Sequence, residues 1–428
     1  MKLMSARGTR DIPPEEKIAR QRIIAMLEKT FELYGFSPLE TPTIERMDVL
    51  AAKYAGGAEI LKETFRFKDQ GDRELGLRYD LTVPLARFVG MNPNVKMPFK
   101  RYAIGQVFRD GPIKTGRMRE FWQCDVDIVG SPSMLADAQC IQIAQKFFSD
   151  VGLDVVIEVS SRKLLDGIIE SCEIPEAKRM PVILEIDKLK KVGLEVVQKN
   201  IKELGVANAA VSKLMEVLGT EGSNFEKLEE LKKLVDNRQA ADGIKEMEEM
   251  LNYLDEKNVV LNLALARGLS YYTGPVFEAF LKDSKLFSSS LAGGGRWDNM
   301  IGDFLGAKQK YPAVGISFGL EPITTVMKLL KKEDEGVRTV TKVFIIPINT
   351  AMECIKIAEE LRRAGVNTDI DIVGRGVSKN LNYANSLGIP YVIFAGEDEL
   401  KQKKVKLRDM KTGDEELVAV KDVVKKLK

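Results

Sequence analysis

The residues best suited to chemistry lie between positions 96 and 130, where cations gather in an otherwise almost neutral chain. The 428 residues contain 65 Lys and Arg against 63 Asp and Glu, a net charge of +2. Within residues 96–120, however, there are seven Lys or Arg and only two acidic residues. Such a local excess of positive charge suits a polyphosphate or a nucleic-acid backbone. The seven cations are Lys96, Lys100, Arg101, Arg109, Lys114, Arg117 and Arg119.

Residues 100–130 predict an antiparallel hairpin, because two strand-like halves flank a connection that contains Gly and Pro. In the second half, the two-residue period of a strand separates polar from apolar side chains. One face would carry Gln123, Asp125 and Asp127, and the other Trp122, Cys124, Val126 and Ile128. A solvated outer face would explain the polar set. The neighbouring arginines and the bulky Phe121 and Trp122 favour the floor of a polar pocket instead.

Asp80 and Thr82 are a second candidate pair, in LRYDLTVPLARF. Because they stand two residues apart, they would point the same way on a strand. An acid beside a hydroxyl suits an ammonium group. A helix cap before Pro84 explains the same spacing at least as well.

A third candidate region is LALARGLSYYTG, which brings an apolar strand up to Arg267. An arginine at the end of a buried strand needs an anionic partner, either a structural carboxylate or a substrate phosphate. Tyr271 and Tyr272 suit a pocket wall, with plain core aromatics as the alternative. Further on, three consecutive glycines precede Arg296, and either the close approach of a ligand or a tight turn would explain them.

The composition also excludes several kinds of chemistry. The chain has no histidine, so it cannot hold a Ser-His-Asp or Cys-His pair, a histidine base or a histidine-ligated metal. It has no G-x-x-x-x-G-K-[ST] loop and no strand-linked G-x-G-x-x-G motif. Its four cysteines are far apart, as in reduced core residues. With no signal peptide and no apolar run of membrane-spanning length, we expect a cytoplasmic protein without a membrane partner.

The elements that must position these residues follow from the spacing of apolar side chains. A first helix is predicted from Pro13-Pro14 to Gly35. Residues 162–256 are rich in Glu, Lys and Leu at helical spacing and predict a helical subdomain. Beyond a charged break at residues 329–339, strand and helix alternate, which predicts a small α/β domain with a largely parallel sheet. A hairpin around residues 411–413 is expected after it.

Together these segments resemble the class II aminoacyl-tRNA synthetases and, within them, the histidyl-tRNA synthetase family. The resemblance runs from GTRDIPP at residue 8 to RDMKTG at residue 408, and LRYDLTVPLAR, REFWQCDVDIVG and LARGLSYYTG are its most distinctive parts. It implies an α+β fold, with an antiparallel sheet core, a helical insertion and a C-terminal α/β anticodon-binding domain. The implied boundaries are 1–161 and 257–328 for the catalytic core, 162–256 for the insertion and 341–428 for the anticodon-binding domain.

The resemblance implies ATP-dependent activation of L-histidine to histidyl-adenylate, followed by transfer to the 3′ end of tRNA(His). ATP would be a substrate, with Mg²⁺ on its phosphates. A carboxylate is already ionised at neutral pH, so activation needs positioned cations rather than a protein base. A homodimer is implied as well, with its interface at TPTIERMDVL, residues 41–50.

By similarity to the family, individual residues receive roles. The α-phosphate of ATP would be held by Arg109 and Arg267. The α-ammonium of histidine would be bound by Asp80, Thr82 and Gln123. The imidazole nitrogens would be recognised by Asp127 and Tyr272, with Tyr271 nearby. Arg117 and Arg119 lie where the family contacts ATP or the acceptor end of the tRNA. The expected anticodon contacts are Arg375, Lys379 and Asn380.

The chain departs from the family pattern at three positions. Ser270 stands where an Asp is usual in the YYTG segment. Gly111 stands where an acid usually follows the hairpin arginine by two residues, with Asp110 beside it. Pro322 stands where the third class II motif ends in an ATP-contacting arginine. Arg296, or an arginine of the hairpin loop, is the candidate substitute for that cation.

The missing arginine leaves a second class of function open. A catalytically silent paralogue could act as a regulatory subunit of histidine biosynthesis or as a sensor of uncharged tRNA. The biosynthetic regulators lack an anticodon-binding domain, which we expect this chain to have. A silent protein would also have no reason to keep Arg109, Gln123, Asp127 and Arg267 together. We therefore favour the enzyme.

Overall fold

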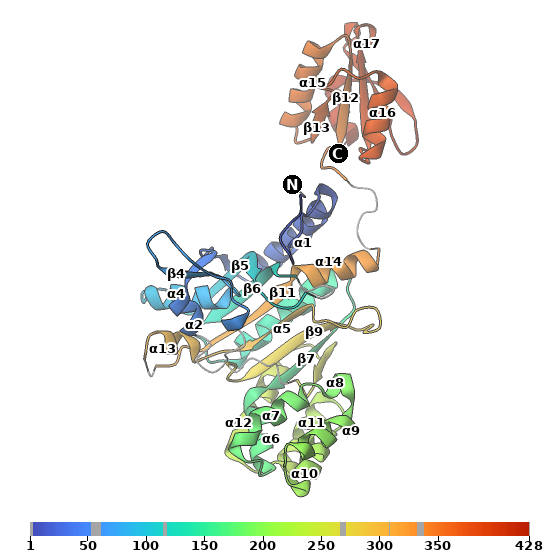
Figure 1. Ribbon diagram of the computed structural model, residues 1–428. Helices are drawn as coiled ribbons and strands as arrows, with labels where there is room; N and C mark the ends of the chain where they lie inside the picture. Colours follow the sequence, from blue (N-terminus) through green and yellow to red (C-terminus); the bar gives the residue numbers. More distant parts are fainter. Residues whose placement is uncertain are drawn as a thin grey trace. The chain divides into compact units, whose positions relative to one another are not determined.

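The protein is seen in a computed structural model that describes residues 3–52, 61–113, 118–265, 271–307, 309–331 and 338–427. The chain divides into two compact units, residues 1–10 with 23–329 and residues 11–22 with 330–428 (Figure 1). The boundaries predicted above for the individual domains stay predictions. Within the described ranges, no helix is long and apolar enough to cross a membrane.

An eight-stranded sheet forms the centre of the first unit. Neighbouring strands run antiparallel, except that β1 pairs with β5, and β7 with β8, in parallel. This confirms the predicted antiparallel core. In spatial order the strands are β1 (Ser37–Pro38), β5 (Phe99–Phe108), β6 (Glu120–Val129), β11 (Ala313–Gly319), β10 (Ala292–Arg296), β9 (Pro275–Leu281), β7 (Val155–Ser161) and β8 (Val259–Leu261).

The main hydrophobic core lies between this sheet and its helices. Helix α5 (Met134–Asp150) packs on β6, β9, β10 and β11, and Figure 1 shows it alongside the sheet. Phe147 of α5 and Phe31 of α1 (Pro14–Leu33) both meet Phe318 of β11, with ring centroids 5.4 and 5.7 Å apart. The predicted apolar face of β6 joins this core through Cys124, Val126 and Ile128. Its polar face must therefore point to the opposite side of the sheet.

A smaller antiparallel sheet lies beside the main one and supports the segment that resembles the dimer motif. Its order is β2 (Ile44–Arg46), β4 (Glu74–Leu77) and β3 (Arg66–Lys68). Three helices pack nearby: α2 (Met47–Ala52), α4 (Thr82–Met91) and α13 (Met300–Phe304). The chain passes from β4 into α4 through residues 78–81, which bring several polar side chains to the site described below.

Residues 162–256 form the predicted helical block. Gly167 and Gly243 explain how its helices α6 and α12 pack so closely. A Cβ at Gly167 would lie 2.5 Å from the Ala240 nitrogen, and one at Gly243 would lie 2.6 Å from the Leu164 nitrogen. The helices are α6 (Arg162–Ser171), α7 (Glu176–Ile186), α8 (Leu189–Val192), α9 (Leu194–Glu203), α10 (Asn208–Leu218), α11 (Asn224–Leu234) and α12 (Arg238–Asn252).

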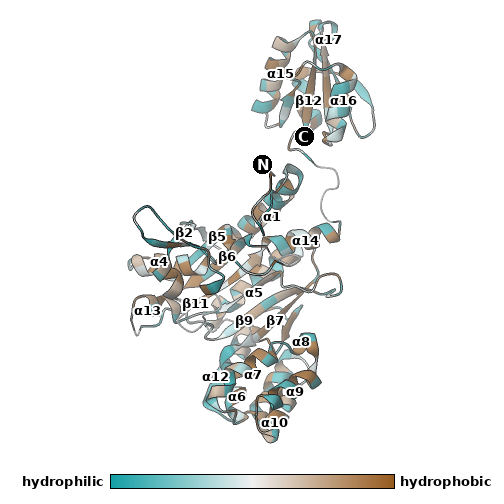
Figure 2. Cartoon of the chain, in the orientation of Figure 1, coloured by the Kyte–Doolittle hydropathy of each residue, from teal (hydrophilic) through white to brown (hydrophobic). Residues whose placement is uncertain are grey.

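The second unit is an α/β domain, as predicted. Parallel strands β13, β12 and β14 are extended by the antiparallel β15 and β16, and the last two form the expected hairpin. Figure 2 shows β12 as hydrophobic, which fits a strand buried on both faces. The short α17 (Glu397–Lys401) and the final α18 (Val420–Leu427) were not predicted. The other elements are β12 (Val343–Ile348), α15 (Ala351–Arg363), β13 (Thr368–Ile370), α16 (Val377–Ser386), β14 (Tyr391–Gly396), β15 (Lys404–Asp409) and β16 (Glu415–Ala419).

Candidate active site

The predicted hairpin exists and places Arg109 directly after its first strand. Strands β5 and β6 pair from Phe99 and Val129 to Phe108 and Glu120. The Arg109 N–H then donates to the Arg119 carbonyl at 2.8 Å. The Arg109 guanidinium lies 4.2 Å from the Tyr79 ring centroid, and its Nε donates to the Tyr79 carbonyl at 3.3 Å. It pairs with no carboxylate among the described residues, so its charge is available to an anionic ligand.

Arg119 lies directly before the second strand of the hairpin and is held more firmly. Its Nη1 is 2.9 Å from the Asp110 carboxylate, and its Nε donates to the Gly111 carbonyl at 3.3 Å. Its backbone N–H donates to the Gly8 carbonyl at 2.9 Å, so the N-terminal segment crosses the hairpin here. Arg117, expected beside it, lies outside the described residues.

Glu63 accounts for the glycine at position 111. A Cβ on Gly111 would lie 2.8 Å from Oε1 of Glu63, so the Glu63 carboxylate occupies the space into which a side chain at 111 would point. The Tyr79 hydroxyl donates to Oε2 of Glu63 at 3.1 Å, and the Asp110 N–H donates to the Glu63 carbonyl at 2.7 Å. Glu63 thus supports the tyrosine on which Arg109 rests. No sequence motif pointed to it.

Gly111→Glu is expected to lower the rate of amino-acid activation by about tenfold or more, because small displacements of a positioned catalytic group are costly. The new carboxylate would displace Glu63 and loosen Tyr79 beneath Arg109. Pyrophosphate exchange measures the effect, with Gly71→Glu in an exposed turn as the control. Adding Glu63→Ala to Gly111→Glu should recover part of the rate. An unchanged rate in the single variant would show that Glu63 is not coupled to Arg109.

The polar face of β6 is buried, which rules out the alternative of a solvated outer face. Asp125 and Asp127 are each only 3% exposed. Gln123 donates from Nε2 to the Ser317 hydroxyl of β11 at 2.9 Å. Asp127 lies 2.7 Å from the guanidinium of Arg101, its register partner on β5. This buried ion pair was not predicted, although cross-strand register opposite Asp127 was the signal that could have found it.

Gly315 of β11 makes room for this arrangement. A Cβ there would lie 2.1 Å from Oδ1 of Asp127. The run of glycines before Arg296 works in the same way, because a Cβ at Gly294 would lie 1.9 Å from the Gly315 carbonyl. These glycines lie in strand β10. They let strands β10 and β11 approach each other closely, and they form no tight turn.

Asp80 caps a helix, so the strand that we considered for Asp80 and Thr82 is wrong. Strand β4 ends at Leu77 and α4 begins at Thr82. Oδ1 of Asp80 accepts the N–H groups of Thr82 and Val83 at 3.1 and 2.9 Å. The same loop still reaches the polar face of β6, because the Leu81 carbonyl accepts a hydrogen bond from Arg101 at 3.0 Å. Asp80 therefore lies near the Arg101–Asp127 pair.

Tyr271 and Tyr272 pack against each other with tilted rings, whose centroids are 4.4 Å apart, and their hydroxyls are 3.3 Å apart. Tyr272 packs on β10, where a Cβ at Gly295 would lie 3.0 Å from its ring. The apolar strand predicted to reach Arg267 is shorter than expected, since β8 ends at Leu261. Arg267 itself, like Ser270, lies outside the described residues.

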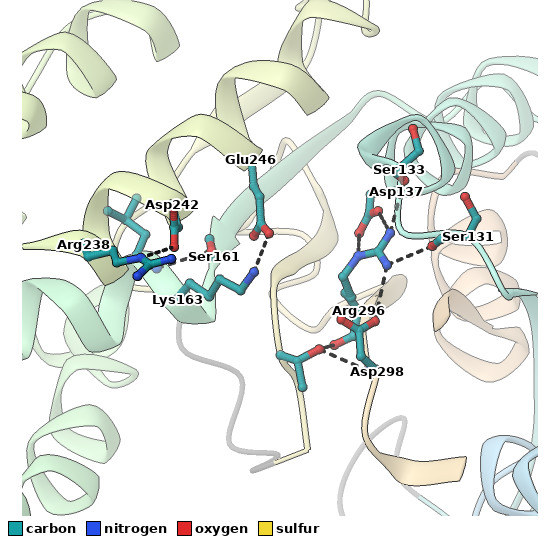
Figure 3. A network of polar contacts seen from close by, with 12 residues as sticks. Ser131, Ser133, Asp137, Ser161, Lys163, Arg238, Asp242, Glu246, Arg296 and Asp298 are labelled. Atoms are coloured by element: carbon teal, nitrogen blue, oxygen red, sulfur yellow. Dashed lines mark hydrogen bonds and ion pairs between the residues drawn. The ribbon is translucent and has the colours of Figure 1, made fainter. Parts of the chain in front are cut away.

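Arg296 is a structural residue in this fold. Its side chain is 2% exposed and paired with Asp137 of α5 through Nη2, while Nε donates to the same carboxylate at 3.2 Å (Figure 3). Further donors reach the Ser131 carbonyl at 3.0 Å and Asp298 at 3.3 Å. Because every arm of the guanidinium is engaged within the core, we withdraw Arg296 from the expected ATP contacts.

Pro322 fits the position that it occupies. It lies in the first turn of α14 (Leu320–Leu329), where a proline costs no helical hydrogen bond. The neighbouring Glu321 accepts the Trp122 N–H at 3.0 Å and so ties α14 to β6. Of the arginines expected to contact ATP, Arg109 and Arg119 are then the ones that remain within the described residues.

An antiparallel sheet whose hairpin presents an arginine beside a buried polar face, with an α/β unit after it, is consistent with the class II aminoacyl-tRNA synthetases. A family model for histidyl-tRNA synthetase matches residues 8–323, and one for an anticodon-binding domain matches residues 342–428. The chain belongs to the histidyl-tRNA synthetase family and has its ligase activity, with histidine, ATP and tRNA as substrates.

Known proteins similar to this chain agree with that assignment. Histidine–tRNA ligase 1 of Bacillus cereus is 45% identical to it, over 97% of this chain and 95% of that protein. The crystal structure of histidyl-tRNA synthetase from Nostoc sp. PCC 7120 matches with a TM-score of 0.88 at 30% identity, over 100% of this chain and 99% of that one. A Bacillus halodurans structure described as an ATP phosphoribosyltransferase regulatory subunit/histidyl-tRNA synthetase has a TM-score of 0.75 at 21% identity. This last likeness supports the fold alone, and nothing favours the regulatory alternative.

Proposed function

We propose that the β5–β6 hairpin carries both halves of the activation site, the amino-acid pocket on the polar face of β6 and the phosphate contact at Arg109. The observation that supports this most directly is the buried polar face itself. Histidine would bind there, and its carboxylate would attack the α-phosphate of ATP to give histidyl-adenylate. The histidyl group would then pass to the 3′ end of tRNA(His).

Phosphate binding is assigned to arginines. Arg109 neutralises the α-phosphate from one side and Arg267 from the other, where they stabilise the charge that develops during in-line attack. Arg117 and Arg119 contact ATP or the acceptor end of the tRNA. Among the described residues no group of three or more Cys, Asp or Glu is placed to hold a metal ion. Mg²⁺ would come to the site with the ATP phosphates, as that ion commonly does.

Histidine recognition is assigned to the polar face and the two tyrosines. The α-ammonium is a threefold donor and would be held by Asp80, Thr82 and Gln123. Asp127 and Tyr272, with Tyr271 beside it, would recognise the imidazole, which presents one donor and one acceptor nitrogen. Because Arg101 holds the carboxylate of Asp127 at 2.7 Å, Asp127 is fixed before the substrate arrives.

Histidine-dependent ATP–pyrophosphate exchange tests this assignment. We expect the purified chain to exchange pyrophosphate with histidine present, and to give only background exchange with each of the other amino acids. Pro322 is compatible with this result if Arg109 and Arg267 supply the cations. A protein that binds tRNA but shows no exchange at any histidine concentration would instead be a silent paralogue.

We also infer a homodimer formed through residues 41–50, which include β2 and part of α2. Ile44 in this segment is 49% exposed in the single chain, as expected for a side chain that a second copy covers. Sedimentation at micromolar concentration should give about twice the mass of one chain, and Ile44→Lys should shift the equilibrium towards the monomer. A single monomeric species for the unaltered protein would contradict the interface.

The cytoplasm is the compartment that this reaction implies.

The second unit would bind the anticodon of the tRNA. Arg375 stacks on the Tyr383 ring at 4.7 Å, which suits contacts with RNA bases. Asn380, also expected to contact RNA, is fully buried and donates to the Asp371 carboxylate at 2.8 Å and to the Arg375 carbonyl at 3.0 Å. It holds the loop that presents Arg375, so we leave it out of the proposed anticodon contacts and keep Lys379.

A further inference from the structure

Asp125 has no role in the assignment above, although it lies between Gln123 and Asp127 on the polar face of β6. Its register partners are Ala103 of β5 and Ser317 of β11, neither of which is charged. The Ser317 hydroxyl bonds to its carboxylate, but Oδ1 is buried and has no hydrogen-bond partner. A buried acceptor left in this state costs about 1–3 kcal/mol.

A second unsatisfied acceptor lies next to it on the same face. Oε1 of Gln123 is also buried and has no hydrogen-bond partner. Gln123 and Asp125 stand two residues apart on one strand and both bond to the Ser317 hydroxyl. Two unsatisfied acceptor oxygens on neighbouring side chains of one face match a ligand with several N–H donors and a positive charge, which is the chemistry of an ammonium group.

The charged side chains around Asp125 also leave a net negative charge. Asp125 is influenced by Arg101 on β5, Asp127 on β6, Asp80 in the loop before α4, and Arg78 after β4. Among the described residues, three buried carboxylates thus face two buried guanidiniums. Burial is the main cause that raises the pKa of Asp125; Arg101 opposes it, the Asp127 and Asp80 charges add to it, and together they bring the pKa to about 7. The surplus negative charge can be relieved by a proton or by a bound cation.

We propose that Asp125 and Gln123 bind the α-ammonium of histidine, and that the ammonium displaces a proton carried by Asp125 in the ligand-free enzyme. The proton passes to solvent and the ammonium takes its place on the carboxylate. The inference rests on the proposed function and specifies which carboxylate of the site receives the substrate's charge.

Histidine affinity then depends on pH in a defined direction. Protonated Asp125 competes with the ammonium, so affinity is highest above the pKa of about 7 and falls as pH drops through it. For this group alone, the dissociation constant should rise about tenfold from pH 8 to pH 6. Protonation of the substrate's own imidazole adds to the pH dependence of histidine affinity equally in every variant. In Asp125→Asn the part of this pH dependence that comes from Asp125 should disappear, and histidine should bind more weakly at pH 8.

Calorimetric titration with histidine at pH 7, in two buffers of different ionisation enthalpy, counts the protons released. We expect about half a proton from Asp125 in the unaltered enzyme, since a group with a pKa near 7 is half protonated there, and none from Asp125→Asn. Imidazole-4-propionate serves as a matched ligand because it keeps the imidazole and the carboxylate but lacks the ammonium. It should release no proton from Asp125.

Each outcome decides the matter. Equal proton release from the unaltered enzyme and Asp125→Asn, or from histidine and imidazole-4-propionate after the protonation of each ligand's own imidazole is subtracted, would overturn the inference. Histidine binding without proton release would overturn it too, while the proposed function stands. Absence of both histidine binding and pyrophosphate exchange would reject the proposed function as well. If Asp125→Asn does not fold, the comparison of the two ligands on the unaltered enzyme is sufficient.

Discussion

Arg109→Ala is expected to lower histidine-dependent pyrophosphate exchange by about 100- to 1,000-fold, the effect of removing one preorganised charge from a transition state. The guanidinium rests on the rings of Tyr79 and Phe121, at 4.2 and 4.9 Å, and pairs with no described carboxylate. Its removal should therefore leave the fold and the amino-acid pocket intact. Histidine affinity measured without ATP should change by less than about threefold, because an interaction made only in the transition state leaves ground-state binding alone.

Two controls make the Arg109 result specific. Arg73→Ala removes an exposed arginine from a turn, where it pairs with Asp69 at 2.7 Å, and should leave the exchange rate unchanged. Arg109→Lys keeps the charge but loses the planar group that stacks on Tyr79, so it should recover only part of the rate. If Arg109→Ala lowers histidine affinity as much as it lowers exchange, the residue shapes the amino-acid pocket and has no special role with the phosphate.

Features that depend on local periodicity could be predicted from the sequence. Alternation along residues 120–129 separates Gln123, Asp125 and Asp127 from the apolar side chains, and the structure places the two sets on opposite faces of β6. The first helix is equally local: Pro14 begins it and Gly35 follows its end with a φ of +77°. Composition and alternation likewise sufficed for the helical block and for most of the α/β unit.

Features that depend on contacts between distant segments could not be predicted from the sequence. Arg296 looked like a free cation because its partner, Asp137, lies 159 residues earlier in the chain. Asp80 could be read as a strand residue or as a helix cap, and only the start of α4 at Thr82 decides between them. Glu63 belongs to no motif and becomes relevant because the fold brings its carboxylate against Gly111. Burial, partner and register are tertiary properties, and a single residue's type does not encode them.

The second large effect is expected at Asp127, where binding and stability must be separated. Asp127→Ala removes the proposed imidazole contact and leaves the Arg101 guanidinium, 1% exposed, without its carboxylate. Histidine affinity should fall by about 100-fold or more, the usual cost of truncating one partner of a buried polar contact. The free energy of unfolding should fall by about 3–5 kcal/mol, because an isolated charge stays in the core.

A double variant separates the two effects of losing Asp127. Replacing Arg101 with methionine in the Asp127→Ala protein removes the orphaned charge, so urea unfolding should show most of the lost stability restored. Histidine affinity should stay low, because the imidazole has still lost its partner. If stability and affinity recover together, Asp127 acts only by neutralising Arg101 and supporting the floor of the pocket. If affinity stays low while stability returns, Asp127 contacts the substrate itself, and the Arg101–Asp127 pair is the device that holds this contact in place before histidine binds.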